Sequence, residues 1–86
     1  MNNKILKFSA SWCGPCKSMS ATLNRMMLPL DVAEIDVDDQ HDVAAKYAIR
    51  GVPTLVAIDD AGKEISRLVG SKNESEIKRW VSSLSA

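Results

Sequence analysis

The stretch Trp12-Cys13-Gly14-Pro15-Cys16-Lys17 is the most informative part of this sequence. Two cysteines spaced Cys-x-x-Cys can pass between a dithiol and a disulfide without moving the backbone. The stretch lies between an apolar run at 5–8 and a helix-like segment at 16–28, so Cys13 should lie at a helix N-terminus. Unpaired backbone N–H groups and the helix dipole favour a thiolate there. We therefore predict a redox-active pair with a reactive sulfur at Cys13.

The residues around the cysteines fit this placement. Gly14 allows a tight turn and places no Cβ beside an incoming substrate sulfur. Pro15 falls in the first helical turn, where its missing N–H and its fixed φ suit helix entry. Trp12 offers a flat apolar surface that either contacts a partner or packs as a partly buried residue. The sequence leaves both interpretations of Trp12 open.

Other uses of a cysteine pair fit this chain less well. A structural zinc site needs four ligands, and the chain offers only Cys13, Cys16 and His41 as cysteine or histidine ligands. A structural disulfide across so short a loop would constrain the unfolded chain little. The chain has 11 basic and 11 acidic residues and no basic stripe with interleaved aromatic residues. We therefore expect neither a metal site nor a nucleic-acid partner.

Length and the N-terminal sequence bear on organisation and location. The 86 residues predict a single domain over 1–86 without an internal linker. Residues 1–4 lead directly into an expected strand, and no apolar run is long enough for a signal peptide or a membrane span. We expect a cytoplasmic monomer without membrane contact, in a compartment where catalytic disulfides are the usual exception to reduced cysteines.

Periodicity and turn residues predict an α/β fold in the order β-α-β-α-β-β-α. Strands are expected at 4–9, 31–37, 54–58 and 64–69, the first two parallel and the last two joined as a hairpin. Together they form a four-stranded mixed sheet with three helices. The last helix should begin at a capping box of Ser71 and Glu74. Apolar stripes predict the core faces of the first and last helices, namely Met19, Leu23, Met26 and Met27, and Ile77, Trp80, Val81 and Leu84.

Three parts of the sequence resemble the thioredoxin family. They are the CGPC motif within 12–17, the run Arg50-Gly51-Val52-Pro53-Thr54, and Gly70 before the final helix. The resemblance covers nearly the whole chain and implies a thioredoxin-like fold. The chain begins at what looks like the family's second strand. It therefore resembles a miniature, glutaredoxin-sized thioredoxin without the usual first strand and helix.

The resemblance also implies a substrate-binding surface. Val52-Pro53 should be a cis peptide beside the cysteines, where the Val52 backbone pairs with an extended substrate segment. The alternative is an ordinary trans proline before the next strand. Gly70 should leave room for substrate backbone, unless it simply ends a strand. With Trp12, these residues would contact the substrate.

This chain departs from the family's pattern near the cysteines. Thioredoxins usually carry a buried aspartate where it has Lys7, and a partnering lysine where it has Glu34. We expect a charge-swapped ion pair, in which either Lys7 stabilises the Cys16 thiolate or Glu34 accepts its proton. The alternative is that Lys7 extends its ammonium out of the sheet beside an exposed Glu34. Ser9 replaces a common second tryptophan, which could alter partner choice.

The activity implied by the resemblance is the reduction of protein disulfides. Cys13 attacks the substrate disulfide, and Cys16 resolves the mixed disulfide and leaves a redox-active Cys13–Cys16 disulfide. The resemblance implies re-reduction by thioredoxin reductase, NADPH as the ultimate donor, no bound cofactor, and substrates such as ribonucleotide reductase. These are roles in electron transport and cell redox homeostasis.

Three alternatives remain. One is a glutaredoxin-like, glutathione-dependent reductase that holds a carboxylate near residues 71–73, at the N-terminus of the last helix. Another is a non-catalytic thioredoxin-fold binding subunit. The third is an oxidant that uses the same cysteine pair in the opposite direction.

Overall fold

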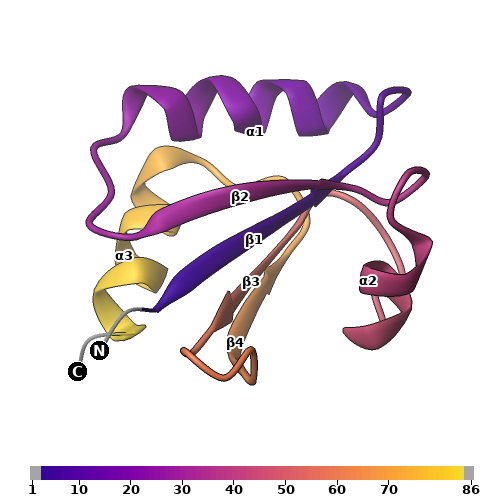
Figure 1. Ribbon diagram of the computed structural model, residues 1–86. Helices are drawn as coiled ribbons and strands as arrows, with labels where there is room; N and C mark the ends of the chain where they lie inside the picture. The colour runs from indigo at the N-terminus through magenta and orange to yellow at the C-terminus, as the bar shows by residue number, and fades with distance from the viewer. Residues whose placement is uncertain (1–2, 85–86) are drawn as a thin grey trace.

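The computed structural model describes residues 3–84, which form one four-stranded sheet and three helices (Figure 1). The predicted fold class and element order are confirmed. The ends of the predicted domain, residues 1–2 and 85–86, lie outside the described part of the chain. The elements are β1 (Lys4–Ser9), α1 (Gly14–Arg25), β2 (Asp31–Asp36), α2 (His41–Lys46), β3 (Thr54–Ile58), β4 (Glu64–Val69) and α3 (Glu74–Leu84).

The sheet has the strand order β2-β1-β3-β4. β1 pairs with β2 in parallel, as predicted, and this register places Lys7 opposite Glu34. β3 is antiparallel to both of its neighbours, β1 and β4. Because β3 is an interior strand covered on both faces, Leu55, Val56 and Ala57 are all fully buried.

Each face of the sheet has its own hydrophobic core. On one face α1 and α3 pack against β1 and β3, and on the other face α2 packs against β1, β2 and β3 (Figure 1). Alternate residues of the two central strands serve the two cores. The buried residues of the first core are Ile5, Met19, Leu23, Leu55, Ala57, Ile77, Trp80 and Val81, and those of the second are Leu6, Phe8, Ile35, Tyr47 and Val56.

The end of α1 differs from the prediction. The helix ends at Arg25 rather than at 28, and Met26 has the extended dihedral angles φ −84° and ψ 137°. The residue before a proline disfavours helical dihedral angles, so Pro29 opposes a helical conformation at Leu28. The chain leaves the helix early, and Leu28 packs against the first core. The prediction of Met27 as a core residue is wrong, because its side chain is 99% exposed.

The predicted capping box of α3 is also wrong. Asn73, not Ser71, precedes the first helical residue, and its Oδ1 accepts a hydrogen bond from the Glu76 backbone N–H at 2.9 Å. Glu76 Oε1 in turn accepts from the Asn73 backbone N–H at 3.2 Å. The box has the expected chemistry but lies two residues further along the chain.

Candidate functional site

The two cysteines lie at the N-terminus of α1, just beyond the carboxyl end of β1. Cys13 is the N-cap residue of α1, and Pro15 occupies the first helical turn as predicted. Cys13 and Cys16 form a disulfide in which both residues are buried, with exposed fractions of 5% and 2%. The Cys13 sulfur also accepts a hydrogen bond from the Cys16 backbone N–H at 3.1 Å. In the dithiol form the same donor would stabilise a Cys13 thiolate.

Gly14 is the first residue of α1 and has no positive φ. No other atom lies within 4 Å of the place that a Cβ on Gly14 would occupy. Local packing therefore does not require glycine here. A role in clearing space for a substrate sulfur stays a prediction.

A second loop packs against the cysteines. The Val52–Pro53 peptide is cis, as the resemblance implies, and Pro53 is buried. Val52 packs against the small cluster formed by Ala10 and the two cysteines. Gly70 has φ +91°, a conformation that side chains disfavour, and its backbone N–H donates to the Pro53 carbonyl at 2.9 Å. Two loops distant in sequence are thus joined beside the disulfide, and their contact with a substrate stays a prediction.

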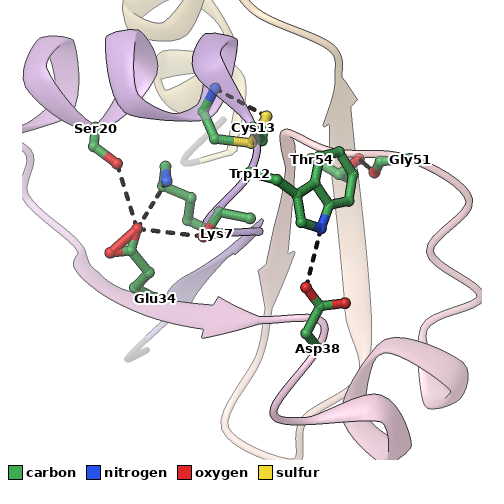
Figure 2. Close-up of a disulfide and its surroundings, with 10 residues drawn as sticks. Lys7, Trp12, Cys13, Ser20, Glu34, Asp38, Gly51 and Thr54 are labelled. Atoms are coloured by element: carbon green, nitrogen blue, oxygen red, sulfur yellow. Dashed lines mark hydrogen bonds and ion pairs between the residues drawn. A yellow bond between two sulfur atoms is a disulfide. The ribbon is translucent and has the colours of Figure 1, made fainter.

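Trp12 stands at the surface beside the disulfide (Figure 2). Its side chain is 69% exposed, so the interpretation as a partly buried packing residue is wrong. The indole Nε1–H donates to Asp38 Oδ2 at 3.0 Å, which fixes the ring relative to the end of β2. Together with Val52 and Val37, Trp12 lines a small cavity of about 160 Å³. Sequence analysis missed Asp38, whose position in the turn after β2 gave no sign of this contact.

Lys7 and Glu34 form an ion pair on the other side of the disulfide (Figure 2). Lys7 Nζ lies 2.9 Å from Glu34 Oε1, and the exposed fractions of the two side chains are 3% and 59%. The alternative in which the ammonium extends out of the sheet is therefore wrong. The hydrogen bond from Lys7 holds the pKa of Glu34 below its usual value, and partial burial opposes this shift.

Two hydroxyl groups complete the surroundings of Glu34. Ser20 Oγ donates to Glu34 Oε1 at 3.3 Å, and Ser9 Oγ donates to the same oxygen at 3.4 Å. Ser9, noted from sequence only as a missing tryptophan, thus belongs to this polar cluster. Ser20 was missed, although its position four residues after Cys16 puts both on one helix face. A cavity of about 650 Å³ is lined by all of these residues, including Cys16.

Other kinds of site find little support in the described structure. Within residues 3–84, no three His, Cys, Asp or Glu side chains are arranged to hold a metal ion. None of the helices in that range has the length and apolar character needed to cross a membrane. His41 is the exposed first residue of α2.

Comparison with known proteins gives a consistent set of relatives. A family model described as thioredoxin matches residues 1–83. Thioredoxin H2 of Arabidopsis thaliana is 39% identical over 90 residues, which cover 99% of this chain and 66% of the plant protein. Mitochondrial thioredoxin of Mus musculus is 33% identical, with coverage of 93% and 50%. A mutant thioredoxin from Halobacterium salinarum has a similar solved structure, with a TM-score of 0.87, 34% identity and coverage of 95% and 74%. The chain thus spans between half and two thirds of the two curated relatives.

Proposed function

Because the chain belongs to the thioredoxin family, we propose that it is a thiol-disulfide oxidoreductase that reduces protein disulfides. The Cys13 thiolate attacks a substrate disulfide, so that a mixed disulfide forms and one substrate sulfur leaves as a thiolate. The Cys16 thiolate then attacks the Cys13 sulfur and releases the second substrate sulfur. Two electrons pass to the substrate, and the Cys13–Cys16 disulfide remains.

One observation carries this proposal. Cys13 caps α1, and its sulfur accepts a hydrogen bond from the Cys16 backbone N–H. A helix N-terminus with an N–H directed at sulfur lowers the free energy of the thiolate, which is both the attacking and the leaving form in disulfide exchange. The neighbouring cis Val52–Pro53 loop and the exposed Trp12 offer the surface against which an extended substrate segment would lie.

The partners and the location follow from the same proposal. We infer that thioredoxin reductase, with NADPH as the ultimate donor, regenerates the dithiol. Substrates would be disulfide-containing proteins, among them ribonucleotide reductase. We place the protein in the cytoplasm, although its relatives include mitochondrial thioredoxins. No bound cofactor is needed for this cycle, because both electrons reside in the cysteine pair.

The first test is a reduction assay with insulin as the disulfide substrate and with NADPH and thioredoxin reductase as the electron source. The wild-type chain should accelerate reduction, and Cys13→Ser should abolish the effect. Cys16→Ser should instead accumulate a covalent complex that dithiothreitol releases. Ser18→Ala, an exposed hydroxyl change on the same helix, serves as the control and should retain the wild-type rate. Full activity in the Cys13→Ser, Cys16→Ser double variant would favour a non-catalytic binding role.

The glutathione-dependent alternative is weakened at α3. A glutathione carboxylate at this helix N-terminus would meet Glu74 and Glu76 in the first turn. The Asn73 side chain and Glu76 already occupy two of the backbone N–H groups there. Like charge and lost donors both oppose binding of an anion. Replacing thioredoxin reductase by glutathione and glutathione reductase in the assay should therefore give slow turnover.

A further inference from the structure

The Lys7–Glu34 pair is asymmetric in a way that matters for Cys16. The Lys7 side chain is 3% exposed, whereas that of Glu34 is 59% exposed. Water screens the field of an exposed carboxylate, but a buried ammonium keeps most of its field in the low-dielectric interior. The two charges are close together, yet their effects on a buried neighbour do not cancel. The net field inside the protein at this place is that of a cation.

Cys16 is the buried neighbour that shares this environment. It is 2% exposed and lines the same 650 Å³ cavity as Lys7. The other charged side chains that line the cavity are Lys17 on α1, Glu34 and Asp36 on β2, and Asp39 in the following turn. Among all of these charged groups, only Lys7 is buried. A buried cation and the second cysteine therefore line the same cavity, and the carboxylates that line it are more exposed to water.

The Lys7 ammonium is a buried cation whose ion-pair partner, Glu34, is largely exposed. A buried cation favours an anion nearby, because an anion offsets the cost of burying the charge. When the disulfide is reduced, the Cys16 sulfur is the group in this cavity that can become such an anion.

We propose that Lys7 is a positioning residue for the resolving step, in which its ammonium stabilises the Cys16 thiolate. This rests on the proposed disulfide-reductase cycle. Cys16 loses its proton to cavity water, the thiolate forms beside the ammonium, and its electron pair then makes the Cys16–Cys13 bond. The Cys13–substrate bond breaks, and the substrate thiolate takes a proton from water. In this arrangement Glu34 holds the ammonium in place and is not the proton acceptor.

The test is the titration of Cys16 in the absence of the other thiol. In a Cys13→Ser background Cys16 titrates alone, so the coupling of two thiols is removed. With ¹³C-labelled cysteine, the Cβ chemical shift is followed from roughly pH 5 to pH 11, which brackets ordinary thiol titration. Lys7→Met should reduce the thiolate-to-thiol ratio of Cys16 at a given pH by about tenfold, or one pKa unit. Lys4→Met, an exposed lysine on the same strand, should leave the ratio unchanged.

Glu34→Gln should change the thiolate-to-thiol ratio of Cys16 in the opposite direction. Removing the carboxylate should raise the thiolate-to-thiol ratio, because the remaining field is that of Lys7 alone. Since Glu34 is exposed, this variant carries the test even if Lys7→Met fails to fold. A lower thiolate fraction in Glu34→Gln, or an unchanged fraction in folded Lys7→Met, would overturn the proposal. Because the titration needs no substrate, its outcome is separate from the insulin assay, so failure of the proposed function is recognised independently.

Discussion

Glu34 gathers three donors on one oxygen, because Lys7, Ser9 and Ser20 all donate to Oε1. These bonds favour the carboxylate over the carboxylic acid, which is why the pKa of Glu34 lies below its usual value. A group with a lowered folded-state pKa adds stability when it is ionised in both states. That stability is lost as the pH falls through the folded-state pKa.

The stability of the fold should therefore depend on Glu34 in a pH-dependent way. Above about pH 4.5, the ordinary value for glutamate, Glu34→Gln should lower the free energy of unfolding by about 1 kcal/mol. This is a charged hydrogen bond discounted for exposure. The difference should shrink toward zero in more acidic solution. Urea unfolding at a series of pH values measures it, with Asp60→Asn, an exposed turn residue, as the control. A difference that stayed constant into strong acid would contradict this account.

Sequence reasoning at the residue scale succeeded where a spacing carried the chemistry. The cysteine spacing predicts the Cys13–Cys16 disulfide, and the resemblance to the thioredoxin family predicts that Lys7 and Glu34 lie opposite each other on neighbouring strands. The contact of Trp12 with Asp38 could not be predicted, because it depends on how the turn after β2 folds back. To predict a hydrogen bond between side chains on different loops, one must know the course of both loops. The periodicity of apolar residues predicts helices and strands but not the course of a loop.

At the scale of elements, strands were easier to predict than helix ends. β1, β3 and β4 match their predicted bounds, because turn residues and apolar runs delimit them. The predicted ends of α1 and α3 were wrong by two or three residues. Helix termini depend on which residue caps and on where the following chain packs, as Leu28 and Asn73 illustrate.

The end of α2 offers a test of helix termination. The Ala48 N–H bonds to the Ala45 carbonyl at 3.1 Å and the Ile49 N–H to the Ala44 carbonyl at 2.9 Å, which is the Schellman pattern. Ala48 has φ 51°, a conformation that suits glycine better than alanine. Glycine would remove this conformational cost from the folded state. That gain should be larger than the loss of stability from the greater entropy that glycine gives the unfolded chain. Ala48→Gly should therefore raise the free energy of unfolding by about 0.5 kcal/mol.

The matched control lies three residues earlier, inside α2. Ala45 is exposed and helical, so Ala45→Gly should lower the free energy of unfolding by roughly 1 kcal/mol. Chemical denaturation of both variants provides the comparison. If both substitutions destabilised the fold equally, the positive φ of Ala48 would not carry the cost assigned to it.

At the scale of the whole molecule, the site depends on both cores. Cys13 and Cys16 lie at the start of α1, which belongs to the first core, and Val52 packs against the second core as well as against the cysteines. Lys7 and Glu34, on neighbouring strands of the sheet, line one cavity together with Cys16. The relative positions of the two loops and the polar cluster are thus set by the sheet that separates the cores.

The two cores should therefore unfold together. Leu55 and Val56 are adjacent on β3, fully buried, and belong to opposite cores. Because they share one backbone ladder, Leu55→Ala and Val56→Ala should each lower the unfolding midpoint of both cores, Leu55→Ala at a cost of about 2–5 kcal/mol. Methyl signals of Ile77 and Ile35, one from each core, would be followed by NMR through a urea titration. Within each protein, whether wild type or variant, the Ile77 and Ile35 signals should have the same midpoint. If Leu55→Ala lowered the Ile77 midpoint and left that of Ile35 unchanged, the cores would be independent, and the site would not be held by a single cooperative unit.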